Sequence, residues 1–197
     1  HFAYVDHGAY PFDKNPDYSG PIKSNMKVQA LRKRSRQMEP GDLAELFRLY
    51  DSEIAYTDSH IGRLIEHLRG RGDLKNTLLV FTADHGFHLG EHSLWCKTSN
   101  YEWDAAVPLI IAPPRLGKRG PASPSPAVPL ALYPTLAELC GLAKPTHLEG
   151  ASLVPALKDP LAEVKPFALT QHPRPAYYTG KEPEVMGYSL RTRHHRY

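Results

Sequence analysis

The sequence is poor in cysteine and has no long apolar run. Its 197 residues include two cysteines, Cys96 and Cys140, which are too few for a disulfide framework and match no zinc-ligand spacing. No apolar run approaches the ~20 residues of a membrane-spanning helix, and no Asn-x-Ser/Thr glycosylation acceptor occurs. A disulfide-stapled module and a membrane span are therefore not expected, while the redox compartment stays open.

The sequence also has little net charge. Lysine and arginine number 24 against 21 aspartates and glutamates, which gives +3 with the 11 histidines neutral. No Lys/Arg run alternates with aromatic residues as in a nucleic-acid groove. The basic stretches at 32–36 and 115–119 are polar and flanked by proline, which favours solvated loops. We therefore expect no nucleic-acid partner.

What the sequence does contain is the composition of a globular domain. Apolar residues make up 41% and charged residues 23%, which is ordinary for a soluble fold with a hydrophobic core. The 19 prolines are about twice the usual share. We therefore expect short elements joined by many loops.

Hydrophobic periodicity predicts one long helix and several short elements. Apolar residues recur at helical spacing from 42 to 68, with Pro40 and Gly41 before them and Gly70 and Gly72 after them. Residues 1–40 contain four prolines and are predicted to be irregular. The other predictions are buried strands at 77–82 and 105–112, the first interior to a sheet, helices at 133–142 and 153–157, a strand at 166–170, and an edge hairpin of 187–192 with 194–197.

The densest chemistry follows the 77–82 strand directly. The run TLLVFTADHGFHLGEHSLWCK, residues 77–97, changes from apolar residues to ionisable ones, with Gly86 and Gly90 allowing tight turns between them. Ligand sites of α/β sheets lie beyond the carboxyl ends of strands, where loops converge. The ionisable residues of this run are Asp84, His85, His88, Glu91, His92 and Lys97.

Asp84 and His85 form a candidate cation pair. As neighbours they can converge on one ligand only if the strand ends before them, because successive strand residues point to opposite faces. A carboxylate and an imidazole suit a divalent cation, and Lys97 offers a compact positive charge to an anionic substrate. A structural role stays open, because an aspartate after a strand is often a turn former or a helix cap.

The run FTADHGFHLGEHSLWCKTSNYEWDAAVPLII resembles the sulfatases of the alkaline-phosphatase superfamily and is most similar to their iduronate-2-sulfatase branch. The stretches LYPTLAELCGL, LEGASLVPAL, QHPRP and MGYSLRTRHHRY agree with that branch, and the resemblance covers roughly residues 43–197. It implies an α/β, alkaline-phosphatase-like sandwich, in which a central, mostly parallel or mixed sheet is flanked by helices. A small C-terminal antiparallel subdomain would follow. Residues 1–142 would belong to the catalytic domain and residues 143–197 would begin the subdomain.

The resemblance also implies an activity and residue roles. A sulfatase hydrolyses a sulfate ester, here of a sulfated carbohydrate or related compound, with a formylglycine nucleophile and Ca²⁺ or Mg²⁺. Asp84 and His85 would bind the metal, Lys97 would contact the sulfate, and His92 would orient the leaving group or donate a proton to it, unless its hydrogen bond is purely structural. His88 would be peripheral. The branch carries a substrate-facing histidine just before a Pro-Phe pair, but Ala9 and Tyr10 precede Pro11-Phe12 here. His7 is the nearby alternative for that role, and it is read as a surface histidine. The compartment would be extracytoplasmic or lysosomal.

Two parts of that site are missing from the sequence. No Asp-Asp pair occurs, and no Cys or Ser stands in a Cys/Ser-x-Pro-x-Arg context that could yield formylglycine. We therefore expect an incomplete fragment whose partner is the remaining N-terminal part of a longer protein, an expectation also supported by a chain that ends within a predicted hairpin. The alternatives are a metal-dependent phosphomonoesterase or phosphodiesterase of the same superfamily, and a non-catalytic fragment or pseudo-enzyme.

Overall fold

The computed structural model describes residue 7 and residues 15–34, 37–114, 120, 122–175 and 181–197. The chain forms two compact units that interleave along the sequence. Unit 1 consists of His1–Thr77 and Gly86–Thr98, and unit 2 of Leu78–His85 and Ser99–Tyr197. The domain boundary expected after residue 142 does not coincide with this division and stays a prediction.

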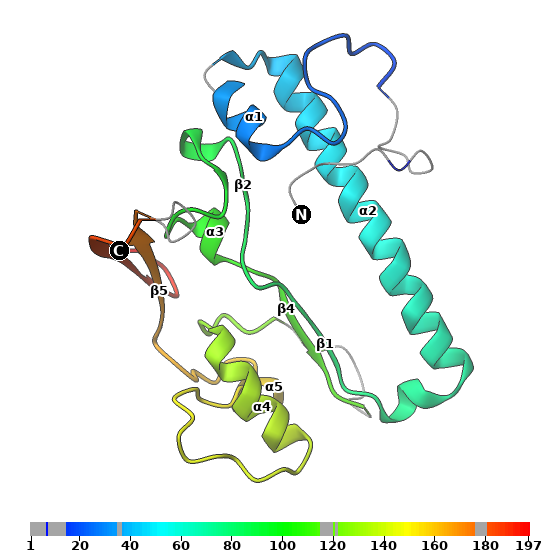
Figure 1. Cartoon of the computed structure of the whole chain (residues 1–197). Coiled ribbons are helices and arrows are strands. Elements are labelled where there is room, and N and C mark those ends of the chain that lie inside the picture. Colours follow the sequence, from blue (N-terminus) through cyan, green and yellow to red (C-terminus); the bar gives the residue numbers. More distant parts are fainter. Residues whose placement is uncertain (1–6, 8–14, 35–36, 115–119, 121, 176–180) are drawn as a thin grey trace. The chain divides into compact units, whose positions relative to one another are not determined.

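Unit 1 contains the longest helix of the chain, α2, over Pro40–Gly70 (Figure 1). Glu39 and Asp42 form a capping box at its start, with the Glu39 backbone N–H 3.3 Å from Asp42 Oδ2, and Pro40 occupies the first turn. This confirms the helix predicted at 42–68. The other elements of unit 1 are α1 (Val28–Arg34), a 3₁₀ turn (Asp73–Asn76), β2 (His88–Leu89), a 3₁₀ turn (Glu91–Ser93) and β3 (Trp95–Cys96).

Helix α1 corrects the prediction of an irregular stretch up to residue 40. Its seven residues lie between Pro21 and Pro40 and contain no proline themselves. A proline excludes a helix interior only where it stands, so the interval between two prolines remains available. Leu31 of α1 is 1% exposed and packs in the core of unit 1.

The core of unit 1 lies against the first half of α2. Its buried members are Ile22, Leu31, Leu46, Leu49, Trp95 and Cys96. The predicted apolar face of α2 continues to residue 68, but the buried residues of the helix end at Ser52, and Ile54 and Leu64 are exposed. Only the first half of the helix is therefore packed within unit 1.

Unit 2 is built from short helices and two-stranded antiparallel sheets. Strand β1 pairs with β4, with Leu79 opposite Ala112 and Thr82 opposite Leu109, and the two run side by side in Figure 1. Strand β5 pairs with β6 from Phe167–Thr192 to Arg174–Val185. The bounds are β1 Leu79–Thr82, α3 Glu102–Ala105, β4 Leu109–Ala112, a 3₁₀ turn Pro129–Ala131, α4 Leu132–Leu139, α5 Val154–Lys158, β5 Phe167–Arg174 and β6 Val185–Thr192.

The sheets of unit 2 depart from the expected interior, mostly parallel sheet. Among the described residues β1 has one strand partner, β4, and the pair is antiparallel. Phe81 and Ile110 are 44% and 59% exposed. The apolar run predicted burial because such runs normally lie between two layers, and no described element covers these side chains.

The carboxyl-terminal hairpin is larger than predicted. The strand read at 166–170 extends to Arg174 and takes β6 as its partner, which the sequence reasoning missed. The smaller pairing predicted between 187–192 and 194–197 is present as a return of the chain, in which Leu190 and Tyr197 exchange backbone hydrogen bonds of 3.0 and 2.9 Å. No helix among the described residues is long and apolar enough to cross a membrane.

Candidate functional site

Asp84 and His85 follow the end of β1 at Thr82, as the cation-pair hypothesis requires. His85 Nε2 lies 3.4 Å from Asp84 Oδ2. The side chain of Asp84 is 82% exposed and that of His85 is 30% exposed, so both remain accessible to a small ligand. Because the strand has ended before them, the two neighbouring side chains are able to meet.

The spacing of this pair fits two adjacent ligands of one hard cation. Two donors about 2.4 Å from Ca²⁺, at a right angle to each other, would be about 3.4 Å apart. Ca²⁺ takes six to eight ligands, mostly oxygen, so the pair would form only part of a coordination shell. Within the described ranges no group of three or more His, Cys, Asp and Glu residues is arranged to hold a metal.

The second half of the motif forms a small hairpin in unit 1. His88 pairs with Cys96 and Leu89 with Trp95. Gly90 has φ +114°, a backbone conformation that residues with a Cβ rarely adopt, so the turn needs a glycine. The Glu91 carboxylate accepts a 2.6 Å hydrogen bond from the Leu89 backbone N–H, which ties the turn to β2.

His92 lies at the tip of this hairpin in a left-handed conformation. Its φ is +55° and that of Ser93 is +59°. Left-handed non-glycine residues cost free energy and often occur at functional sites. His92 is exposed, whereas His88 is 0% exposed, and their rings meet edge to face at 6.4 Å. The hairpin thus presents His92 outward and buries His88, and the peripheral role expected for His88 stays a prediction.

Lys97 immediately follows the hairpin and is exposed within unit 1. Cys96 before it has φ +68°, and Thr98 after it is buried. From the sequence we expect Lys97 to lie near Asp84 and His85. Asp84 and His85 belong to unit 2, while Lys97 and His92 belong to unit 1. The convergence of Lys97 and His92 with Asp84 and His85 therefore stays a prediction.

His7 has closer partners than a plain surface histidine. Its Nε2 is 3.3 Å from the Glu53 carboxylate, and its ring stacks on Tyr56 at 4.0 Å. The side chain is 17% exposed. The contacts attach His7 to helix α2, which corrects the reading of a surface side chain. The Pro11-Phe12 pair lies outside the described residues.

A cavity of about 250 Å³ in unit 2 was not foreseen from the sequence. Thr82, the last residue of β1, contributes to its wall, as do Leu109, Leu169 and the two arginines Arg191 and Arg196. The arginines share the Glu102 carboxylate, at 3.3 and 2.7 Å. These residues are far apart in the sequence, so no local pattern could have indicated the cavity.

A model of the Sulfatase family matches residues 6–142. The chain therefore belongs to the sulfatase family, within the alkaline-phosphatase superfamily, and it contains the Asp-His-Gly segment and the hairpin described above. This confirms the resemblance seen in the sequence.

The chain is similar to sulfatases from several organisms. It is 36% identical over 115 residues to an N-acetylglucosamine-6-O-sulfatase of Bacteroides thetaiotaomicron, covering 58% of this chain and 21% of that protein. It is 29% identical over 200 residues to iduronate 2-sulfatase of Homo sapiens, covering 75% and 36%. The chain thus spans only about a fifth to a third of the length of these curated relatives.

Solved structures share the fold. The complex of BT4656 with its substrate D-glucosamine-2-N,6-O-disulfate matches with a TM-score of 0.68 and 29% identity, covering 83% of this chain and 34% of that chain. The phosphonate monoester hydrolase SpPMH from Silicibacter pomeroyi matches with the same TM-score and identity, covering 80% and 33%. Proteins that share this fold thus include one with a disulfated sugar as its substrate and one named a phosphonate monoester hydrolase.

Proposed function

We propose that this chain supplies part of the active site of a sulfuric ester hydrolase that acts on a sulfated sugar. The observation that supports it most directly is the Asp84–His85 pair, placed just beyond β1 at the spacing of two cation ligands. Membership of the sulfatase family adds to this. The names of two relatives, an N-acetylglucosamine-6-O-sulfatase and an iduronate 2-sulfatase, favour a sugar sulfate as substrate.

In this proposal each half of the motif has a task. Asp84 and His85 hold a divalent cation, Ca²⁺ or Mg²⁺, which when bound acts as a Lewis acid and template for the sulfate. The Lys97 ammonium offsets negative charge on the sulfate oxygens; at ~4 Å and an effective dielectric near 20 such a contact is of order 4 kcal/mol before desolvation is subtracted. His92 lies at an exposed hairpin tip, from which it orients the leaving alcohol or donates a proton to it.

The nucleophile of the reaction is not encoded in this chain. Neither Cys96 nor Cys140 is followed by proline two residues later and arginine four residues later. We propose that a formylglycine, together with further acidic ligands for the cation, comes from the rest of a full-length protein. The 197-residue chain alone is then expected to hydrolyse no sulfate ester, because nucleophile and cation normally act as one unit.

The second candidate function is hydrolysis of a phosphonate or phosphate ester. The match to the phosphonate monoester hydrolase from Silicibacter pomeroyi supports it. Such esters carry negative oxygens that a cation pair and Lys97 would also contact. A two-metal mechanism, however, would need additional ligands, and the described residues bring no third metal ligand to Asp84 and His85.

The test is a paired assay of the full-length protein on a chromogenic aryl sulfate and a matched aryl phosphonate. We expect faster turnover of the sulfate, loss of most of this turnover in Lys97→Ala, and unchanged activity in Lys75→Ala, which removes an exposed lysine of a 3₁₀ turn. A preference for the phosphonate would favour the second candidate. Full activity in Lys97→Ala would contradict the sulfate contact.

A further inference from the structure

The cavity of about 250 Å³ in unit 2 lies close to the proposed cation pair. Thr82, the last residue of β1, forms part of its wall, and Asp84 follows two residues later. Two residues of extended chain span about 7 Å at most, so the wall of the cavity comes within that Cα distance of Asp84. The cavity and the pair belong to the same unit. A group attached to a sulfate that Asp84 and His85 hold is therefore within reach of the cavity.

The size and the walls of the cavity suit a single sugar ring. Drug-sized ligands occupy pockets of about 300–1,000 Å³, which are mostly apolar with a few well-placed polar groups. This cavity is slightly smaller, and most of its wall is apolar, with Leu109 of β4, Leu132 of α4 and Ala168 of β5 among the residues. It has room for one monosaccharide and not for an oligosaccharide.

The charged side of the cavity comes from one face of the β5–β6 hairpin and the chain that returns beside it. Successive strand residues alternate between faces, so Ala168 and Thr170 share a face with Arg191, the partner of Ala168 in the register. Arg196 pairs with Arg191 through an isolated antiparallel bridge. All four residues line the cavity. The hairpin thus places two neighbouring arginines in its wall.

The positive charge of these arginines is only partly offset. Among the described residues that line the cavity, the charged ones are Glu102, Arg191 and Arg196, so two positive charges face one negative charge. Like charges opposite one another destabilise paired strands. The Glu102 carboxylate, 3.3 Å from Arg191 Nε and 2.7 Å from Arg196 Nε, offsets one of them. An anion bound beside the arginines would offset the other.

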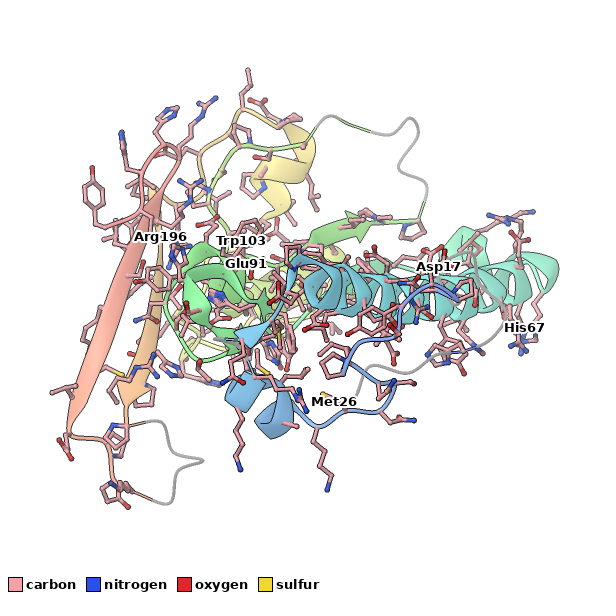
Figure 2. All side chains as sticks on the ribbon, turned by 90° about the horizontal axis from the view of Figure 1, so that it is seen from above. Asp17, Met26, His67, Glu91, Trp103 and Arg196 are labelled. Atoms are coloured by element: carbon pink, nitrogen blue, oxygen red, sulfur yellow. The ribbon has the colours of Figure 1, made fainter. Side chains whose placement is uncertain are left out.

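Each guanidinium group also keeps a hydrogen-bond donor. The Nη1 of Arg191 donates to the Thr192 carbonyl at 2.5 Å. Arg196, labelled in Figure 2, is held between β6 and α3, and its Nη1 donates to the Asn100 carbonyl at 3.0 Å and to the Ser189 hydroxyl at 2.9 Å. Within the described ranges neither Nη2 has an acceptor. The side chain of Arg191 is 34% exposed and that of Arg196 is 19% exposed, so Arg191 is the more accessible donor.

We propose that the cavity is a subsite for the sugar of the sulfate ester, in which Arg191 binds a second anionic substituent of that sugar, a carboxylate or a further sulfate. A guanidinium fork matches the oxygens of such oxyanions, and the bonds to them are charge-assisted. The inference rests on the proposed function, because it takes the reacting sulfate to be held by Asp84 and His85. Arg191 then determines specificity: a sugar with two anionic groups binds better than one with a single sulfate.

The test measures inhibition of aryl sulfate turnover by sugars in the full-length protein. The inhibitors are a monosulfated hexose, the same hexose with a second sulfate, and a monosulfated uronic acid, so the last two distinguish a second sulfate from a carboxylate. We expect at least one doubly anionic sugar to have an inhibition constant at least about tenfold below that of the monosulfated hexose. Competitive inhibition requires binding alone, so the result does not depend on which sulfate is hydrolysed.

Two variants should change this selectivity in opposite directions. Arg191→Gln removes the charge and the fork, and should bring the inhibition constants of singly and doubly anionic sugars to within about twofold of each other. Glu102→Gln removes the carboxylate that competes for the arginines, and should tighten the doubly anionic sugar by at least about threefold. A purely structural ion pair predicts the same direction for both variants. Arg193→Gln, at an exposed arginine just after β6, should keep the wild-type selectivity.

Three results would overturn the inference while sparing the proposed function. They are equal inhibition constants for singly and doubly anionic sugars in the wild type, selectivity that survives Arg191→Gln, and a loss of selectivity in Glu102→Gln. If the full-length protein hydrolysed no aryl sulfate, the proposed function would fail instead. Calorimetric titration with the same three sugars would then show whether Arg191 still selects a second anion, and equal affinities there would remove the subsite as well.

Discussion

The two units of this chain are stabilised in different ways. In unit 1, side chains from a loop, α1, α2 and β3 meet in one apolar core, with Leu46 and Leu49 each 1% exposed. In unit 2, the apolar residues of the two strand pairs remain largely open, and Leu169 and Tyr188 are 54% and 62% exposed. Buried polar groups fix much of unit 2: Thr135 joins α4 to the start of α5, and Arg196 joins β6 to α3.

This difference in packing predicts which contacts stabilise each part of the segment from Asp84 to Lys97. Unit 1 carries Lys97 and His92 on a hairpin whose base, Trp95 and Cys96, is part of the apolar core. Unit 2 carries Asp84 and His85 on an exposed strand end. Stability of the hairpin that carries His92 and Lys97 should therefore depend on core packing, and that of the Asp84–His85 segment on directional polar contacts.

The largest expected effect separates the packed core from the open strands. Leu46→Ala in unit 1 should lower the free energy of unfolding by about 2–5 kcal/mol, because it leaves a cavity in a buried cluster. Ile110→Ala on β4 should cost less than about 1 kcal/mol, because this side chain is mostly in water already. Urea unfolding of the 197-residue chain measures both. Equal losses would remove the distinction between the units.

The next effect tests the buried hydrogen bonds of Thr135 that join α4 to the start of α5 in unit 2. The Thr135 hydroxyl donates to the Ala131 carbonyl at 2.5 Å and accepts from the Leu153 N–H at 2.9 Å, in a site with 0% exposure. Thr135→Val keeps the shape but leaves the Leu153 N–H unsatisfied, which should cost about 1–3 kcal/mol. Thr77→Val is the control, since it removes an exposed hydrogen bond of 2.8 Å. If both variants unfold at the same urea concentration, the hydrogen bonds of Thr135 do not stabilise unit 2.

A smaller effect concerns the pH dependence of the free energy of unfolding, which should differ between the two units. Burial lowers the pKa of His172 in unit 2 from its ordinary value of 6.5, and Arg174 adds to this, while Asp104 opposes it. The folded state therefore favours neutral His172, so stability present above pH 6.5 is lost as the pH falls through that value. His172→Gln should reduce the loss of unfolding free energy between pH 7 and pH 5.5, about a pH unit below 6.5.

Glu45 in unit 1 should affect the free energy of unfolding at a lower pH than His172 does. Burial raises its pKa, but hydrogen bonds from Arg48 and Asn15 outweigh this, and the net shift is downward from 4.5. Its contribution is thus present above pH 4.5 and is lost only as the pH falls below it. Glu45→Gln should leave the slope between pH 7 and pH 5.5 unchanged. If it instead abolished that slope, the assignment of the two units to different pH ranges would be wrong.

The sequence predicted the regular elements better than their surroundings. The helix at 42–68 was found within two residues at each end, because apolar periodicity together with Pro40-Gly41 before it and the glycines Gly70 and Gly72 after it mark it locally. The antiparallel pairing of β1 with β4 was missed, since pairing depends on a segment some thirty residues away and not on local periodicity. Burial of Phe81 was also predicted wrongly, because an apolar run indicates a preference for burial and does not supply a covering layer.

The candidate site was predictable only in part for a similar reason. Asp84 and His85 were singled out because they are neighbours after an apolar run, and their side chains do meet. The hydrogen bonds of Arg196 with Asn100, Glu102 and Ser189 were not predicted, because these residues come from distant segments that carry no shared motif. Contacts between distant segments need a structure, whereas contacts between neighbours can be read from the sequence.

The most direct test of the account is calorimetric titration of Ca²⁺ into the full-length protein, compared with its Asp84→Asn variant. The substitution keeps the size of the side chain and removes the charge that a hard cation prefers. We predict one Ca²⁺ bound per chain and an affinity at least about tenfold weaker in Asp84→Asn, a loss of about 1.4 kcal/mol or more, while Asp73→Asn, at an exposed turn, binds like the wild type. Equal affinity in Asp84→Asn and wild type would contradict the assignment of Asp84 and His85 to the cation.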